Sequence, residues 1–225
     1  SVVLLFGAGL LLQSLWHLLR TDTGYRTTNI ATLTVGLPGA RYPETPQIVS
    51  FYDRLLPQLQ ALPGVDRVGF VNILPLSGGY SGDSFTIDEH PTPAPGREPN
   101  AEHRDISEGY FETLGVPLKK GRLFTAHDDT DALKVALINE SMARAFFPGE
   151  DALAKHIKYN EVSREIVGIV GDIRHFGVAE TPRPEYYFPF RQDALSEQTF
   201  VVRGEGDSAR LVPAVRAAIR AQDPE

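Results

Sequence analysis

The sequence contains no cysteine, and only one methionine and one tryptophan occur among its 225 residues. The lack of cysteine excludes disulfide bonds, thiolate metal sites and cysteine nucleophiles, but it leaves both the cytoplasm and an oxidising compartment open. Basic residues are also in the minority: 22 Lys and Arg stand against 29 Asp and Glu, and the formal net charge is −7. Because contact with nucleic acid requires concentrated positive charge, we expect no nucleic-acid partner.

The sequence also lacks the common motifs for nucleotides and metals. No segment matches the GxxxxGK[ST] phosphate loop, and "GIVGDI" (168–173) has too few glycines for a dinucleotide fingerprint. The Asp-rich "HDDTD" (127–131) lacks the glycine and distal glutamate of a calcium loop, which favours a simple turn. No two of the six histidines have the i, i+4 spacing of a zinc-binding helix. We therefore expect no cofactor and no metal site.

Charged side chains are absent from the first 19 residues, "SVVLLFGAGLLLQSLWHLL". About 20 such residues cross a bilayer as a helix. We interpret residues 1–20 as the C-terminal part of a transmembrane or stalk helix, with lipid around residues 1–19, Trp16 near the interface and Arg20 in water. A signal peptide fits poorly because the run has no basic start and no cleavage site. A buried core helix of a soluble protein is the alternative.

Two β-α units are expected near the ends of the chain. Residues 29–38 alternate like a strand with one buried face, a helix follows with Thr45 as N-cap, and 65–75 reads as the next strand. The pattern begins again with a strand at 198–204 and a helix from Ser208, but the chain stops before a closing strand. Both ends of the sequence are therefore interpreted as cuts within a longer protein.

The middle of the chain differs from its ends in composition and in the order of its expected elements. A proline-rich loop at 88–100 precedes strands near 101–107 and 164–175, and a strand–helix pair in which Asn139 caps the helix. The strand at 185–190 is expected at a sheet edge, because Pro189 cannot donate to a ladder. The fold class is accordingly α+β, with two β-α-β type units at the ends of the chain and a second set of elements inserted between them. The expected divisions are the membrane segment 1–20, a subdomain of 21–87 and 191–225 made from the two units, and an inserted mixed α/β subdomain of 88–190.

A candidate catalytic triad also occurs in the sequence. "GDS" (82–84) is the nucleophile motif of one family of serine esterases, and "DIRH" (172–175) offers Asp172 and His175 at the spacing that such enzymes use for acid and base. In those enzymes the serine opens a helix, whose N-terminus stabilises the oxyanion. Ser84 instead follows a glycine-rich turn and precedes a strand-like segment. We therefore expect no catalytic residue, and keep a membrane-anchored esterase using Ser84, His175 and Asp172 as an alternative.

Longer stretches resemble one family throughout the chain. The segments are "GAGLLLQSLWHLLRTDTGYRTTNIATLTVGLP" (7–38), "FYDRLLPQLQALPGV" (51–65), "ISEGYFETLGVPLKKGRLFTAHD" (106–128), "VALINESMARAFFPGEDALAKHI" (135–157) and "EIVGIVGDIRHFGVAETPRPEYYFPF" (165–190). They resemble the MacB-like periplasmic core domain of ABC transporter permeases of the FtsX/MacB type, and are most similar to the large duplicated permeases abundant in acidobacteria.

This resemblance implies a non-enzymatic domain of a bacterial inner-membrane permease, which lies on the periplasmic side from about residue 21 onward. It also implies that the subdomain of 21–87 and 191–225 is porter-like and that 88–190 is inserted into it. Such a domain couples cytoplasmic ATP hydrolysis mechanically to the export or extrusion of a substrate. The implied partners are a cytoplasmic ABC ATPase, a second copy or half of the permease and, in some members, a periplasmic adaptor protein. A stand-alone extracytoplasmic binding or adaptor-docking module is the remaining alternative.

Overall fold

The computed structural model describes residues 13, 16 and 23–223, which form a mixed α and β fold as the sequence predicts. The strands are β1 (Ile30–Gly36), β2 (Val65–Val71), β3 (Gly82–Ser84), β4 (Thr86–Ile87), β5 (Asn100–Ile106), β6 (Leu118–Gly121), β7 (Val135–Asn139), β8 (His156–Tyr159), β9 (Val162–Val170), β10 (Glu185–Pro189) and β11 (Glu197–Gly204). The helices are α2 (Thr45–Gln60), α3 (Tyr110–Leu114), α4 (Glu140–Phe146) and α5 (Val212–Gln222), with 3-10 turns η1 (Phe190–Gln192) and η2 (Ser208–Leu211).

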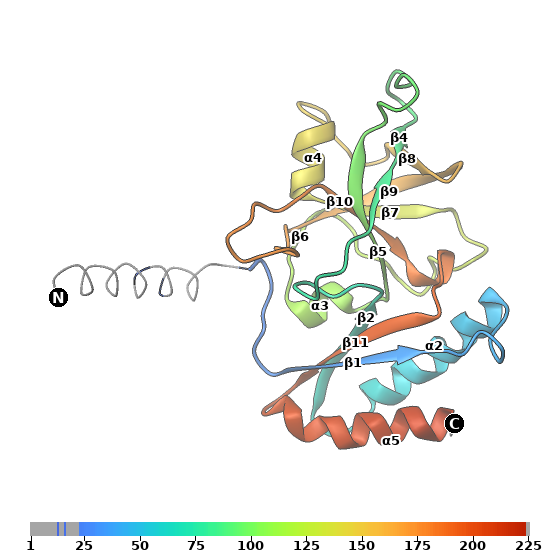
Figure 1. Ribbon diagram of the computed structural model, residues 1–225, viewed down its shortest axis with the longest axis vertical. Helices are drawn as coiled ribbons and strands as arrows, with labels where there is room; N and C mark the ends of the chain where they lie inside the picture. The colour runs from blue at the N-terminus through green and yellow to red at the C-terminus, as the bar shows by residue number, and fades with distance from the viewer. Residues whose placement is uncertain (1–12, 14–15, 17–22, 224–225) are drawn as a thin grey trace, which may run out of the picture.

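All the strands belong to one mixed sheet (Figure 1). Its order is β1-β11-β2-β5-β10-β7-β9-β8-β4, with β3 added beside β5 and β6 beside β9. The first three strands of this order, β1, β11 and β2, pair antiparallel with one another in turn. Strands β5 and β10 are parallel, as are β7 and β9. A single pair of residues, Val71 and Ile106, joins β2 to β5 in the ladder. The sheet is therefore continuous, but the pairing between β2 and β5 is the shortest of its ladders.

The lower part of Figure 1 contains the two expected β-α units. Strand β11 lies between β1 and β2 and is antiparallel to both, so β1-α2-β2 is a split β-α-β unit. Helix α2 buries Phe51, Tyr52, Leu55 and Leu59 against this part of the sheet. Full burial of an apolar side chain of this size contributes roughly 1.5–3 kcal/mol, so this face of α2 holds the unit together.

Helix α2 begins differently from the sequence prediction. Its N-cap is Glu44 and not Thr45, because Glu44 and Gln47 form a reciprocal capping box between side chains and backbone. Thr45 is instead the first helical residue, ahead of Pro46. Pro57 lies inside the helix and does not end it, since the helix continues to Gln60.

Alternation along the strands places different residues on the two faces of the sheet. Phe70 and Phe200 pack on the α2 face, whereas Val71 and Val201 belong to a second core with α3. Gly69 allows α3 to approach closely, because a Cβ atom there would lie 2.5 Å from the Cα atom of Tyr110. The absence of a side chain at Gly69 therefore determines how closely α3 packs against β2.

The upper part of the sheet corrects one prediction. Strand β10 is not an edge strand: it is wholly buried and lies between β5 and β7. Pro189 is compatible with this position because it is the last residue of the strand, beyond the pairs that Tyr186 and Tyr187 make with β7. The missing N–H of proline therefore removes no hydrogen bond from the middle of the ladder.

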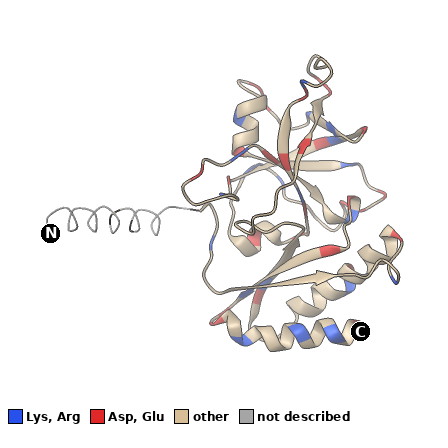
Figure 2. Cartoon of the chain, viewed as in Figure 1, with Lys and Arg blue, Asp and Glu red and all other residues tan. Residues whose placement is uncertain are grey.

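The expected membrane segment, residues 1–20, lies outside the described residues apart from Gln13 and Trp16. Within the part of the chain that the structure describes, no helix is both long and apolar enough to cross a membrane. One sheet runs through both the expected subdomains, and the division at 87/88 and 190/191 stays a prediction. Figure 2 shows acidic and basic residues interspersed over most visible elements, while α5 carries mainly basic ones.

Candidate functional site

The chain enters the folded domain through a short segment held between two distant parts of the sequence. The carbonyl of Thr23 accepts a hydrogen bond from the backbone N–H of Arg174 at 3.0 Å. The backbone N–H of Arg26 donates to the carbonyl of Leu114, at the end of α3, at 2.7 Å. Residues 23–26 therefore bridge α3 and the loop that follows β9, and we call this segment the junction.

Gly24 makes the junction sterically possible. Its φ angle is +83°, and a Cβ atom on this residue would lie 1.9 Å from the carbonyl oxygen of Asp172. Both the left-handed backbone and the close approach exclude a side chain. The backbone of the entering segment thus packs directly against the backbone of the loop after β9.

A cavity of about 430 Å³ with a mixed polar and apolar lining opens beside the junction. It is lined by residues of the junction, the turn after α3, β6, α4 and the loop after β9. Its charged lining residues are Arg26, Lys119, Glu140, Asp172 and Arg174. Lys119 and Glu140 form an ion pair at 3.3 Å across the cavity wall. Both signs of charge therefore face the cavity, and neither dominates it.

Asp172 holds the first turn of α4 in place. Its carboxylate accepts hydrogen bonds from the backbone N–H of Ser141 at 2.7 Å, from the Ser141 hydroxyl at 2.9 Å and from Arg144 at 2.7 Å. A carboxylate at a helix N-terminus is stabilised by the helix dipole and the unpaired N–H groups. This carboxylate therefore serves the packing of α4 and does not orient His175.

His175 points into a buried cluster of charges at the centre of the sheet. Its Nε2 atom lies 3.0 Å from Oε2 of Glu185, and Nε of Arg104 lies 3.3 Å from the other carboxylate oxygen. Arg104 also contacts Glu102 at 3.4 Å, and the hydroxyl of Tyr187 donates to Glu185. Arg104 and Glu185 are almost completely inaccessible to solvent. We call this set the central charge cluster.

The charges in this cluster control the ionisation of Glu185. Burial alone would raise the pKa of this carboxyl, but the opposing effects of His175 and Arg104 outweigh it, so the pKa is lowered. Glu185 is therefore ionised in the folded domain at neutral pH. Removing one partner of such a buried pair leaves an uncompensated charge, which makes the cluster a strict structural requirement.

The loop between β9 and β10 covers the central charge cluster. The guanidinium of Arg183 lies 4.0 Å from the ring centre of Phe176 and 3.7 Å from a carboxylate oxygen of Glu102. The carbonyl of His175 accepts a hydrogen bond from the N–H of Leu76 at 2.8 Å. This loop therefore joins the junction, the cluster and the glycine-rich turn after β2.

The three residues of the candidate triad occupy three different environments. Ser84 is exposed at the end of β3 and pairs with Asn100 of β5 in the ladder. Asp172 is engaged by α4, and His175 by Glu185. No hydrogen bond links these three residues in the part of the chain that the structure describes. The geometry needed for nucleophile activation is not assembled.

The Asp-rich segment forms a turn, as the sequence predicts. Asp128 accepts hydrogen bonds from both terminal nitrogens of Arg122, at 2.7 and 2.8 Å, and from the N–H of Thr125 at 2.8 Å. Burial raises the pKa of Asp128, but these hydrogen bonds and the Arg122 charge lower it by more. Asp129 accepts from the N–H groups of residues 131 and 132 within the turn.

One group of potential metal ligands does emerge among the described residues: His103, Asp105 and Asp193. The histidine spacing of a zinc-binding helix does not indicate this group, because His103 and Asp105 lie two residues apart on a strand. The signal in the sequence is the His-x-Asp pattern within the expected strand 101–107, where both side chains share one face. The third residue comes from a distant segment that no local pattern indicates.

Comparisons with known proteins agree with this architecture. The sequence model of the MacB-like periplasmic core domain matches residues 1–222. The chain is 35% identical over 78 residues to the macrolide export ATP-binding/permease protein MacB of Mannheimia succiniciproducens, an alignment that covers 35% of this chain and 12% of that protein. The chain therefore spans only a small part of this curated relative.

Two solved structures share the fold. The periplasmic region of MacB from Actinobacillus actinomycetemcomitans aligns with a TM-score of 0.57 and 19% identity, covering 91% of this chain and 88% of that one. The extracellular domain of the ABC-type transporter YknZ from Gram-positive bacteria aligns with a TM-score of 0.50 and 17% identity, covering 82% and 88%. With the family match over nearly all 225 residues, the chain belongs to the family of MacB-like periplasmic core domains.

Proposed function

We propose that this domain transmits movement between the membrane-embedded part of an ABC transporter permease and the space outside the membrane, without catalysing a reaction. The observation that carries this proposal is the junction. Residues 23–26 are hydrogen-bonded to the end of α3 and to the loop after β9 through their backbones. A displacement of the entering segment would therefore move two parts of the domain together.

The contacts beyond the junction support a path into both parts of the sheet. Helix α3 packs on β2 and β11, so its movement would reach the two β-α units. On the other side, Arg174 is followed directly by His175, which contacts Glu185 in the central strand β10. Packed cores transmit displacement because they have low compressibility. The junction would thus act on both parts of the sheet at once.

The partners and location follow from likeness to the family. ATP would be hydrolysed by a cytoplasmic ABC ATPase, and residues from about 21 onward would lie on the periplasmic side of a bacterial inner membrane. The expected further partners are a second copy or half of the permease and a periplasmic adaptor protein. The relative from Mannheimia is named for macrolide export, but we assign no substrate to this chain.

The test replaces Gly24 by alanine in the complete transporter. The added Cβ atom would collide with the Asp172 carbonyl, so Gly24→Ala should loosen or displace the junction. We expect ATP hydrolysis to continue while export falls, which is the signature of uncoupling. The matched control is Gly96→Ala, because Gly96 also has a positive φ angle, +77°, but no atom within 4 Å of the added Cβ.

Two outcomes would contradict the proposal. If Gly24→Ala exports substrate at the rate of Gly96→Ala, the junction does not carry the coupling. If export persists when the complete permease is separated from its ATPase, ATP hydrolysis does not drive export through this domain. No observation favours the esterase, because Ser84 is not hydrogen-bonded to Asp172 or His175 among the described residues.

A further inference from the structure

A second polar cluster lies on the opposite face of β5 from the central charge cluster. Since side chains alternate along a strand, Arg104 faces one side while His103 and Asp105 face the other. The Nε2 atom of His103 lies 3.0 Å from Oδ1 of Asp105, and both residues are buried. Asp193, which follows η1, offers a carboxylate oxygen to the same place, and one ligand atom from each residue lies within 4.8 Å of the others.

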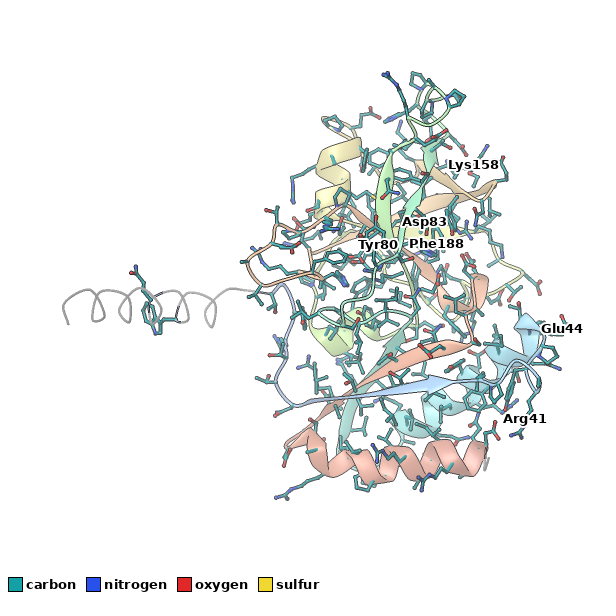
Figure 3. The ribbon with its side chains drawn as sticks, in the orientation of Figure 1. Arg41, Glu44, Tyr80, Asp83, Lys158 and Phe188 are labelled. Carbon is teal, nitrogen blue, oxygen red and sulfur yellow. The ribbon has the colours of Figure 1, made fainter. Side chains whose placement is uncertain are left out.

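A third carboxylate approaches from the neighbouring strand. Asp83 of β3 places Oδ2 3.7 Å from Nδ1 of His103. Figure 3 labels Asp83 and Phe188 in the upper part of the fold, and the His103 ring centre lies 4.7 Å from that of Phe188. His103 therefore sits between carboxylates on both of its ring nitrogens.

The permanent charges in this cluster do not balance. Arg164 supplies one positive charge: its Nη2 atom lies 3.5 Å from Asp193, and its guanidinium lies 3.8 Å from the ring centre of Phe188. Three carboxylates, those of Asp83, Asp105 and Asp193, lie around His103; Asp105 is buried, whereas the Asp83 and Asp193 side chains are each 36% exposed. A buried carboxylate is costly unless a cation or a hydrogen-bond donor compensates it.

Tyr186 gives an independent indication that a polar group belongs here. Its ring stacks on that of His103, with centroids 5.3 Å apart and planes inclined by 19°. The residue is completely buried, and its hydroxyl has no hydrogen-bond partner in the part of the chain that the structure describes. The hydroxyl is close enough to Asp83 and Asp105 for their charges to act on it. A buried hydroxyl without a protein partner requires a polar group nearby, and an ion with its bound water would supply one.

We propose that His103, Asp105 and Asp193 bind a divalent transition-metal ion of the zinc class, with Asp83 as an adjacent carboxylate. Zinc accepts histidine nitrogen and carboxylate oxygen together, whereas calcium and magnesium select oxygen ligands. Asp193 is partly exposed, with 36% of its side chain accessible, so the ion can enter from solvent. The metal would fasten β5 to the segment that leads into β11. This inference does not depend on the proposed coupling function.

The test is a zinc titration of the metal-stripped 225-residue chain, followed by calorimetry and by competition with a chromophoric chelator. We expect one zinc ion per chain, and an affinity that falls about tenfold or more in His103→Gln and in Asp193→Asn. Zinc should also raise the midpoint of thermal unfolding of the unmodified chain, because ligands stabilise the state that binds them. Millimolar calcium or magnesium should not displace it.

The matched control is His156→Gln. This residue is also a histidine beside a carboxylate, with Nδ1 2.7 Å from Glu89, but the pair lies at the surface. Zinc binding and the thermal shift should persist in this variant. The proposal is overturned if zinc does not bind saturably, if His156→Gln abolishes binding, or if Asp193→Asn binds zinc as tightly as the unmodified chain. Asp193→Asn decides the matter if His103→Gln does not fold, because Asp193 lies in a partly exposed position.

Discussion

Nε2 of His175 and Oε2 of Glu185 lie 3.0 Å apart, although nine residues separate them in sequence and they come from a loop and from the central strand β10. Their contact joins the loop beside the junction to a strand that is buried on both faces. On the other side of Glu185, Arg104 of β5 completes the compensation of its charge. The stability of the domain should therefore depend on this cluster more than on its surface ion pairs.

Replacing Arg104 by methionine should destabilise the domain by about 3–5 kcal/mol, because it leaves Glu185 buried with less compensation. Urea unfolding followed by circular dichroism measures this change. The control is Arg210→Ala: the Arg210 side chain is 87% exposed beside Asp207, and loss of such a pair costs about 0–1 kcal/mol. Equal midpoints for the two variants would show that the buried cluster contributes no more than a surface pair.

The lowered pKa of Glu185 predicts a pH dependence of stability. A carboxyl whose pKa is lower in the folded than in the unfolded state stabilises the fold above the unfolded value, here 4.5, and this contribution is lost as the pH falls through the folded value. The difference in unfolding free energy between the unmodified chain and Glu185→Gln should therefore be largest at neutral pH and shrink as the pH falls below the unfolded value. A difference that stays constant from neutral to acidic pH would contradict the assignment.

Gly69→Ala should destabilise the domain by about 1–3 kcal/mol, the usual cost of overpacking a core. The added Cβ atom would lie 2.5 Å from Tyr110 Cα, so α3 would have to move away from β2. Gly39→Ala is the control, because no atom lies within 4 Å of a Cβ at that position. Thermal unfolding of both variants measures the cost, and a Gly69→Ala midpoint equal to that of Gly39→Ala would show that α3 packs less tightly than the structure indicates.

Local pattern predicted much of the fold. Apolar alternation and helical spacing identified β1 and α2, because each has one buried face. Short apolar runs identified β2 and β11, which are buried on both faces. Asn139 was correctly expected to cap α4, since its side chain accepts from the N–H of Met142 at 2.8 Å. The hairpin of β8 and β9 was missed: its turn uses Asn160 and Glu161 with positive φ angles, and a glutamate there carries no turn signal.

The errors arose where long-range pairing overrides local preference. Pro189 taken alone predicts an edge strand. Because it is the last residue of β10, however, the strand pairs with β5 on one side and with β7 on the other. The candidate triad, expected from the sequence only as an alternative, is not assembled because long-range contacts also separate its members. Asp172 and His175 are close in sequence, but the loop turns one carboxylate toward α4 and the imidazole toward Glu185.

The sequence by itself determined the α+β class, the family and the elements that carry periodic apolar faces, because apolar periodicity and family-specific segments are properties of residues near one another in the chain. Only the tertiary structure decided which polar groups meet. Junction contacts such as Thr23 with Arg174, and ligand groups such as His103 with Asp193, join segments that are far apart in sequence. Their proximity depends on strand order and register, which the sheet fixes as a whole and no local pattern records.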